Sequence, residues 1–425
     1  MAKTKTIYVF EYGVLQVGHP YNNIVFSQTH FDLLAKYLTI NTKPQLYSLL
    51  HKKIKFCNYV GVIKVADITI EVLPKTDRHE ENEVVWQSVL LNMLAISLQV
   101  EAKTTNNADI QIKHHSVLET YIQVFLDEVK KIVHQGLVKK YRQSISNQTA
   151  LKGKLLIHQH ISKNVVHAER FYISHTVYDR DNVYNFILLE TLLCIKALNI
   201  SDSLNHDAAS VLINFPICRP VKISEKLFQR LMFDRKTEQY KTAIQLARII
   251  LLNYHPDVKG GINNILAIMF DMNLLWENYV FWILKRASIK SEYNITVKAQ
   301  QKTLFWQHPD KWNLRLVPDL LLDVEREGIK KHFVLDTKWK YKSDTSVEDV
   351  RQMYAYSHYF LRKASYLLYP DRVEGEVKFK GGSFYLPATN SLSEFNCGIG
   401  FVDILSEKQL NTNLGRSIVK SLFEK

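Results

Sequence analysis

Short runs of β-branched and aromatic residues, separated by turn signals, mark the first 75 or so residues. The runs cover residues 6–10, 60–63 and 68–73. Such runs are typical of strands, because branched and aromatic side chains pack well on a pleated surface. The N-terminal region is therefore predicted to be rich in strands.

The pattern becomes helical from residue 84 onward. Val85, Val89, Met93 and Ile96 recur at the spacing of one helix face. Residues 84–100 also carry five Gln, Ser and Asn side chains and fall short of the roughly 20 residues that a bilayer needs, so a core helix is expected rather than a membrane span. The N-terminus has no apolar signal segment.

Two more helical stretches follow. Ser116 and Glu119 form a capping-box pattern, and Gly136 closes the predicted helix. A second helical region covers residues 182–255, with a helix at 237–254 that ends before Pro256, and Gly260-Gly261 then provides a flexible joint. The basic residues 138–143 between them are interpreted as a solvated run more readily than as a phosphate or partner contact.

The last unit starts after this joint and mixes both periodicities. A long helix is predicted at 263–286 and another at 346–363, with strands at 293–305, 314–324, 332–339, 365–368, 383–386 and 398–404. This order indicates an α/β sandwich around a central sheet. Because 425 residues exceed one ordinary core, three domains are expected, at residues 1–165, 166–258 and 259–425.

Composition limits the classes of protein to which this chain can belong. A hydrophobic content of 46% indicates a folded chain, and a net charge of +13 favours polyanionic partners such as nucleic acid, although charge alone does not establish one. The four cysteines are far apart and form no C-x-x-C pair, which excludes a zinc ribbon and a disulfide scaffold. We expect a cytoplasmic protein with reduced thiols.

The most informative residues are Asp319, Asp336 and Lys338. Two apolar runs flank a charged turn at Gly328, so they can form a hairpin that holds Asp319 in one strand and the other two near the end of the second. Asp336 and Lys338 are two apart and share one sheet face. Buried carboxylates on neighbouring strands repel each other unless a cation lies between them, and hard oxygen ligands favour Mg²⁺ or Mn²⁺.

A lysine beside such a metal can orient or deprotonate a water, so the pattern predicts a phosphodiesterase site. The alternative is that the aspartates are strand-end residues and Lys338 is a surface ion-pair partner. Further candidates favour the site. Gln352 and Tyr356 lie one helical turn apart, and Glu277 lies in an otherwise apolar helix. Glu277 can equally be an exposed helix residue and Tyr356 a core residue.

These residues resemble a known superfamily. Pro318-Asp319 followed by Asp336-Thr337-Lys338 is similar to the PD-(D/E)xK nuclease motif, and Gln352 with Tyr356 is similar to the Q-x-x-x-Y feature of its RecB-like branch. Residues 70–75, 151–155, 272–279 and 334–340 further resemble the McrC family, the nuclease subunits of McrBC-type modification-dependent restriction systems.

The resemblance implies a fold, a site and partners. The fold would be a β-rich and helical N-terminal region followed by a PD-(D/E)xK-type α/β nuclease core. Asp319, Asp336 and the main-chain carbonyl of Thr337 would hold Mg²⁺, with Mn²⁺ as a substitute, and Lys338 would be the catalytic lysine. Lys340 and Lys342 continue the basic edge, where they either contact the DNA backbone or are merely solvated.

The implied partners are DNA containing modified cytosine and a hexameric McrB-like AAA+ GTPase. The N-terminal part would dock into that ring and stimulate GTP hydrolysis, and nuclease domains would pair on DNA. The chain has no G-x-x-x-x-G-K-[ST] loop, so it is not expected to bind nucleotide itself. Two alternatives remain: a non-catalytic adaptor of the ring, and a RecB-like repair nuclease.

Overall fold

The computed structural model describes the chain at residues 5–40, 45–75, 82–97, 117–198, 200–255, 265–289, 291–308, 312–340, 346–371, 377–406 and 409–424. It is a mixed α/β protein, as predicted. None of the helices within these ranges is both long enough and apolar enough to span a bilayer.

The N-terminal region is rich in strands, which confirms the prediction. The three predicted runs form β1 (Lys5–Phe10), β7 (Tyr59–Val65) and β8 (Ile68–Leu73). They belong to a five-stranded sheet of order β1-β8-β7-β13-β12, with β12 (Tyr254–His255) and β13 (Ile265–Asp271) arriving from much later in the chain. The smaller elements are β2 (Val14–Gln16), β3 (Pro20–Tyr21), β4 (Ile24–Val25), β5 (Tyr47–Leu50), β6 (Lys53–Phe56) and a helix that the pattern did not predict, α1 (Gln28–Ile40).

The predicted helix at 263–286 is wrong in its first part. β13 occupies residues 265–271, and α9 (Met272–Ala287) begins only afterwards. A continuous apolar run fits a buried strand as well as a buried helix, so periodicity alone does not separate them. The true start is marked by Asp271, whose side chain accepts hydrogen bonds from the N–H groups of Asn273 and Leu274.

The chain divides into two compact units. The first consists of Met1–Lys5, Ile63–Thr69 and His115–Ile268. Its helices are α3 (Val117–Gln135), α4 (Ile157–Asn164), α5 (Val183–Leu198), α6 (Asp202–Leu212), α7 (Glu225–Gln229) and α8 (Lys241–Asn253), preceded by the 3-10 turn η1 (Glu238–Tyr240). The helical region predicted at 182–255 is thereby confirmed, and Gly136, with φ of 93°, follows α3 as expected. Ser116, Pro256 and Gly260-Gly261 lie outside the described residues.

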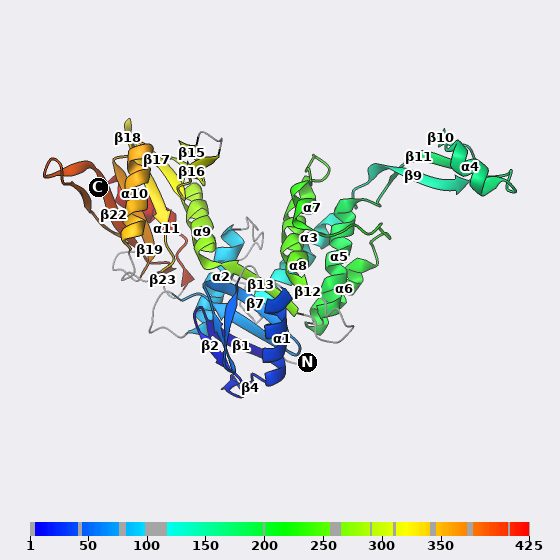
Figure 1. The fold of residues 1–425 in the computed structure, drawn as a ribbon, viewed down its shortest axis with the longest axis horizontal. Helices are drawn as coiled ribbons and strands as arrows, with labels where there is room; N and C mark the ends of the chain where they lie inside the picture. The colour runs from blue at the N-terminus through cyan, green and yellow to red at the C-terminus, as the bar shows by residue number, and fades with distance from the viewer. Residues whose placement is uncertain are drawn as a thin grey trace. The chain divides into compact units, whose positions relative to one another are not determined.

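The first unit also contains a small sheet that the sequence did not predict. β10 (Lys154–Leu155), β11 (Phe171–Asp179) and β9 (Lys140–Gln148) pair antiparallel in that order, with α4 against β11 (Figure 1). The basic run 138–143 leads into β9. There, Lys140 pairs with Asp234 and Arg142 with Asp179, so these two charges of the run expected to be solvated are balanced within the fold.

The second unit consists of Thr6–Val62, Ile70–His114 and Met269–Lys425. It includes α2 (Glu83–Ser97), the predicted core helix, and a seven-stranded sheet of order β14-β17-β18-β19-β22-β20, in which β21 also pairs with β22. The strands are β14 (Asn294–Ala299), β17 (Leu320–Arg326), β18 (Ile329–Thr337), β19 (Ala364–Pro370), β20 (Val377–Lys380), β21 (Ser383–Leu386) and β22 (Ser391–Val402). Two further pairs are β15 (Thr303–Gln307) with β16 (Asn313–Leu316), and β23 (Leu405–Ser406) with β24 (Gln409–Leu410).

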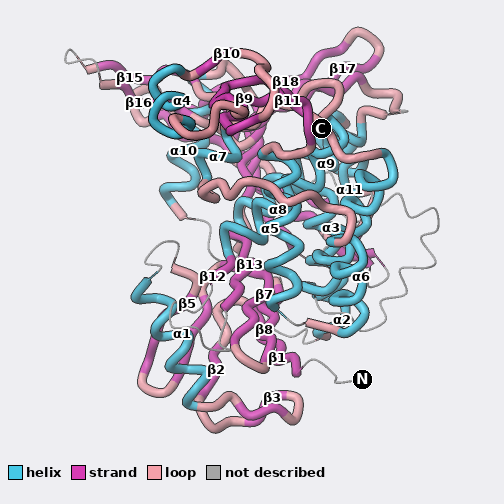
Figure 2. The backbone as a smooth tube through the Cα atoms, turned by 90° about the vertical axis from the view of Figure 1, so that its right-hand side faces the viewer, coloured by secondary structure: helices cyan, strands magenta, loops and turns pink. Residues whose placement is uncertain are grey.

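Helices cover this sheet. α10 (Val347–Tyr359) packs on β18, β19 and β22 (Figure 1), while α9 packs on β14 and β18 and contacts α11 (Leu414–Phe423) (Figure 2). Leu321, Val334 and Leu367 point to α10 and form a core with its Met353 and Tyr356. Because side chains alternate along a strand, Asp336 and Lys338 are on the same side as Val334. The sheet therefore directs both polar residues towards α10.

Candidate active site

Asp319 and Asp336 lie at the same end of two paired strands. β17 and β18 are antiparallel with Leu320 opposite Leu335, so extending this register by one residue places Asp319 opposite Asp336. Oδ2 of Asp319 accepts hydrogen bonds from the backbone N–H (2.8 Å) and the hydroxyl (2.9 Å) of Thr337. These two bonds fix the orientation of Asp319. Thr337 thus acts on Asp319, and metal binding by its carbonyl stays a prediction.

Lys338 completes the group from the residue after β18. Its Nζ lies 2.7 Å from Oδ2 of Asp336, 3.7 Å from Oδ1 of Asp349 and 3.3 Å from Oε1 of Gln352. Its side chain is 22% exposed, whereas that of Asp336 is fully buried. The ammonium group is therefore held next to the buried carboxylate and still reaches solvent.

α10 supports this lysine through a chain of hydrogen bonds. Oε1 of Gln352 accepts from Lys338, its Nε2 donates to the hydroxyl of Tyr356 at 2.8 Å, and that hydroxyl donates to the carbonyl of Val317 at 2.9 Å. The helix begins with a capping box at Ser346, in which Asp349 is the reciprocal partner. Gln352 and Tyr356 thus lie at the site, and Tyr356 also belongs to the core.

Glu277 approaches from α9. The residue is only 8% exposed, which argues against a solvated helix glutamate, and its Oε1 accepts a 2.6 Å hydrogen bond from Nε2 of Gln300. The backbone N–H of Gln300 in turn donates to the carbonyl of Asp319 at 3.0 Å. Gln300 therefore connects Glu277 to Asp319. No sequence pattern indicated Gln300 as a site residue, because its position depends on a backbone φ of +50° that local pattern does not predict.

Lys340 and Lys342 are the two lysines expected to contact the DNA backbone. Lys340 forms an ion pair with Asp349, so part of its charge is already balanced. Lys342 lies outside the described residues. A contact of Lys340 with DNA stays a prediction. Asp349, which the sequence did not single out as a site residue, contacts both Lys338 and Lys340 and is recognisable only as the fourth residue of the capping box.

The electrostatics reflect crowding of buried acids. Burial raises the pKa of Asp336 to about 7, with the charge of Asp319 adding to the effect and Lys338 opposing it. Burial, and then the charge of Asp319, also raise the pKa of Glu277 to about 7. The pKa of Asp319 is raised by burial despite the hydrogen bonds from Thr337. Burial favours the neutral form of Lys338, but the hydrogen bond to Asp336 and the charges of Asp336, Asp319 and Asp349 together outweigh burial and raise the lysine pKa.

The unsatisfied oxygens of Asp336 are the feature of this group that a hard divalent cation would complete. Both oxygens of Asp336 are buried and accept no well-directed hydrogen bond from a described residue, which leaves the ion pair with Lys338 as their polar contact. When all are ionised, the carboxylates of Asp319, Asp336 and Glu277 carry two more negative charges than the ammonium group of Lys338 compensates. Within the described part of the chain, no three His, Cys, Asp or Glu side chains are grouped closely enough to hold a metal ion between them, and Asp319 and Glu277 bond to Thr337 and Gln300. Mg²⁺ suits such an arrangement because it retains several water ligands.

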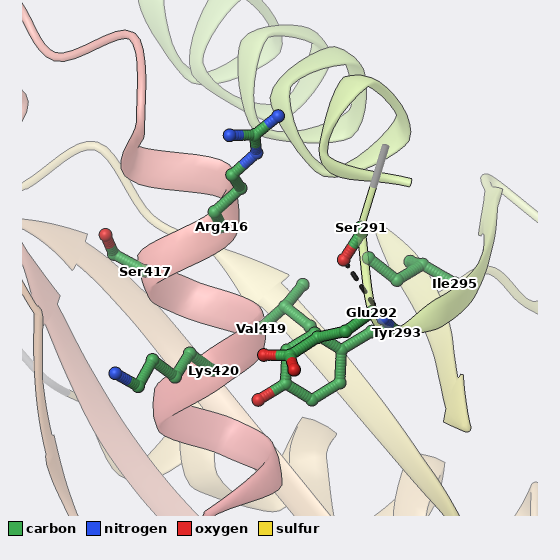
Figure 3. A pocket seen from close by; sticks show the side chains of 8 residues that line it. All are labelled: Ser291, Glu292, Tyr293, Ile295, Arg416, Ser417, Val419 and Lys420. Carbon is green, nitrogen blue, oxygen red and sulfur yellow. Dashed lines mark hydrogen bonds between the residues drawn. The ribbon is translucent and has the colours of Figure 1, made fainter. Parts of the chain in front are cut away.

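A separate pocket of about 390 Å³ lies in the same unit (Figure 3). Glu292 and Tyr293 line it from just before β14, and Arg416 and Lys420 line it from α11. Asn294 pairs with Glu325, at the opposite end of β17 from Asp319, so this pocket is remote from the acidic residues. It is not part of the candidate site.

Two solved structures have a fold similar to that of this chain. A chain of the refined half-complex from a tetradecameric assembly of Thermococcus gammatolerans McrB AAA+ hexamers with bound McrC superposes with a TM-score of 0.66 and 18% identity, covering 99% of this chain and 100% of that one. A chain of the cryo-EM structure of the Thermococcus gammatolerans McrBC complex gives a TM-score of 0.50 and 20% identity, covering 67% and 89%. At these identities the likeness establishes the fold alone.

The sequence comparison is more specific. No curated relative matches the chain. The family model described as "McrBC 5-methylcytosine restriction system component" matches residues 54–370, about three quarters of the sequence. This range contains Glu277, both aspartates, Lys338, Gln352 and Tyr356. The chain therefore belongs to the family of McrBC 5-methylcytosine restriction system components.

Proposed function

We propose that this chain is the metal-dependent endonuclease subunit of a modification-dependent restriction system, and that it hydrolyses DNA phosphodiester bonds at Asp319, Asp336 and Lys338. One observation carries the proposal: the fully buried carboxylate of Asp336, the partly buried carboxylate of Asp319 and the ammonium group of Lys338 converge where β17 starts and β18 ends. An ordinary structural ion pair does not need a second carboxylate beside the first, because like charges raise each other's pKa.

The order of the surrounding elements supports a PD-(D/E)xK-type core. β17 and β18 form an antiparallel hairpin, α10 follows, and β19 then pairs parallel to β18. In such a core the acidic residues are expected at the exit of the hairpin, with supporting residues on the following helix. Gln352 and Tyr356 occupy that position.

When bound, Mg²⁺ would supply Lewis acidity, polarising a phosphoryl oxygen and making a water molecule more acidic. Asp319 and Asp336 would hold it, Mn²⁺ being an alternative, with Glu277 as a further carboxylate within electrostatic reach of Asp319. Thr337 keeps Asp319 oriented through its N–H and hydroxyl. Lys338 places a positive charge beside Asp336, where it can orient the attacking water or stabilise charge on the phosphate.

The partner follows from the family. Both solved structures described above contain McrB or McrBC assemblies of Thermococcus gammatolerans. We extend this to the present chain: a hexameric McrB-like AAA+ GTPase would recruit it to DNA containing modified cytosine, and the chain would stimulate GTP hydrolysis. The absence of a phosphate-loop motif from the sequence agrees with a division of labour in which the ring alone binds nucleotide.

The test is reconstitution with the AAA+ protein, GTP, Mg²⁺ and methylated closed circular DNA. Wild type should cut, whereas Asp336→Ala and Lys338→Ala should not, and both variants should still stimulate GTP hydrolysis. Glu327→Ala is the matched control, because Glu327 is an exposed acid at the far turn of the same hairpin. Cleavage by pure Asp336→Ala protein would exclude this site.

Two other outcomes identify the alternatives. Stimulation of GTP hydrolysis without cleavage in Mg²⁺ or Mn²⁺ would mean that the chain is an adaptor of the ring. Equal cutting of unmethylated and methylated circles, or cutting only from DNA ends, would mean a repair-type nuclease. Each outcome replaces one part of the proposal and leaves the family membership intact.

A further inference from the structure

β15 and β16 form a two-stranded ribbon that exposes large apolar side chains. Within the described residues the two strands pair only with each other. Leu304, Phe305, Trp306, Trp312 and Leu314 are each between 41% and 52% exposed. A group of exposed large apolar side chains on so short a ribbon marks a binding site more often than a free surface, and an isolated ribbon gains little stability from them. We call residues 303–307 and 312–316 the aromatic ribbon.

The rings of the aromatic ribbon are arranged against one another. The centroids of Trp306 and Trp312 are 4.8 Å apart in an edge-on contact, and His308 stacks on Trp312 at 5.1 Å. Phe305 contacts Tyr359 of α10 edge-on at 5.8 Å. These contacts restrict the side chains before any ligand arrives, which lowers the entropy cost of binding to them.

The charges near the aromatic ribbon favour a polyanionic ligand. Lys298, Lys302 and Arg315 are exposed and form no ion pair with a described residue. Between residues 293 and 318, the described residues include no acidic side chain. Two copies of this surface would repel each other, whereas aromatic rings interleaved with unpaired cations suit a nucleic-acid strand.

The residues that flank the aromatic ribbon on both sides are hydrogen-bonded to candidate site residues. It is inserted between β14 and β17, and Gln300 at its start bonds to Asp319 and Glu277. At its other end the carbonyl of Val317 accepts from Tyr356. The hydroxyl of Tyr359, one turn further along α10, donates to the carbonyl of Leu304. A strand whose phosphate reaches Asp319 and Asp336 must therefore pass close to the aromatic ribbon.

We propose that the aromatic ribbon is a base-stacking element that holds the DNA beside the scissile phosphate, with Trp306 and Trp312 as the rings that contact bases. The inference rests on the proposed nuclease function for its substrate. Every base has a flat face, so stacking of this kind contributes affinity at the cut site without reading sequence. Recognition of the modification is then left to the partner ring.

The test measures DNA binding without cleavage. The full chain is titrated, in EDTA, against a short fluorescein-labelled duplex and the matching single strand, and anisotropy gives the dissociation constants. The Trp306→Ala/Trp312→Ala variant should bind at least one of these probes about tenfold more weakly or worse, in line with the loss of two stacking contacts. Trp306→Phe/Trp312→Phe should recover most of the affinity, because the rings are retained.

Controls separate the possible outcomes. Tyr385→Ala removes an aromatic side chain that is 58% exposed on a different hairpin, and should leave affinity unchanged. Equal affinity of the double-alanine variant and wild type for both probes would overturn the inference. So would loss of self-association, measured by sedimentation, at unchanged DNA affinity, because a second copy would then be the occupant. Failure of Asp336→Ala to abolish cleavage concerns only the proposed catalytic site, since binding in EDTA does not depend on it.

Discussion

Nε1 of Trp339 donates a 2.7 Å hydrogen bond to Oε1 of Glu11, a residue 328 positions earlier in the chain. The same oxygen accepts the backbone N–H of Lys75 at 2.9 Å, and both side chains are buried. Trp339 directly follows Lys338, and its ring also contacts Trp276 of α9 edge-on. The backbone that carries the candidate catalytic lysine is therefore fixed in part by the N-terminal region.

Glu11 is expected to make stability depend on pH. Burial raises its pKa from 4.5 to about 7 in the folded protein, against the hydrogen bonds from Trp339 and Lys75. Below the unfolded-state pKa both states are protonated. As pH rises towards 7, only the unfolded state ionises freely, so the free energy of unfolding falls, by up to about 3 kcal/mol. Above the folded-state pKa the loss is complete.

The measurement compares wild type with Glu11→Gln by denaturant unfolding at a series of pH values. Glutamine keeps the acceptor for Trp339 but carries no charge. The stability of wild type relative to the variant should decline between about pH 5 and pH 8. Parallel profiles for the two proteins would contradict a buried, ionising Glu11.

Asp336→Asn is expected to stabilise the metal-free protein at alkaline pH. Burial and the charge of Asp319 raise the pKa of Asp336 to about 7, so its ionised form costs folding free energy when no cation is present. A neutral amide of the same shape avoids that cost, and the gain at about pH 8 should be on the order of 2 kcal/mol. Below the unfolded-state pKa, Asp336 is protonated in both the folded and the unfolded protein, so the gain in stability should vanish.

The same variant tests metal binding. Thermal melting in EDTA and in Mg²⁺ should give a higher melting temperature with Mg²⁺ for wild type and for the exposed control Glu327→Gln, but not for Asp336→Asn. A shift of equal size in all three proteins would place the cation elsewhere.

Local pattern predicted the part of the site that depends on neighbouring residues. Residues two positions apart along a strand point to the same face, so Asp336 and Lys338 were expected together. The turn at Gly328 was enough to bring Asp319 opposite Asp336. The helix predicted at 346–363 likewise corresponds to α10, which carries Gln352 and Tyr356. These features require only short-range geometry.

Other features depend on the tertiary structure. Gln300 reaches Glu277 because of a left-handed backbone conformation and an inserted ribbon, neither of which has a signature in its own segment. Glu11 is an ordinary residue after a strand until Trp339 packs on it. The error at β13 has the same origin, since pairing with β7 and β12 makes an ambiguous apolar run a strand.

Lys338 and Lys340 are expected to separate catalysis from DNA binding. Lys338→Met removes the ammonium beside Asp336 and should lower the cleavage rate about 100-fold or more. Lys340→Met, two residues away on the same strand exit, should lower it less than about tenfold and reduce the slope of DNA affinity against salt by about one ion. Single-turnover cleavage and anisotropy titrations at several salt concentrations measure the two effects. Equal loss of rate in both variants would argue that neither lysine acts in the chemical step.

Tyr356→Phe is expected to weaken the support of Lys338 without emptying the core. The ring would remain packed with Val334 and Met353, but the carbonyl of Val317 and the amide of Gln352 would each lose a partner. Because these groups are partly buried, stability should fall by about 1–2 kcal/mol. Gln352 would then hold Lys338 less firmly, and the cleavage rate should drop about tenfold while DNA affinity in EDTA stays unchanged. Tyr354→Phe, on an exposed part of the same helix, is the matched control and should alter neither quantity. If Tyr356→Phe destabilises the protein but cuts at the wild-type rate, the hydroxyl has a structural role only and the hydrogen-bond chain to Lys338 does not contribute to the reaction.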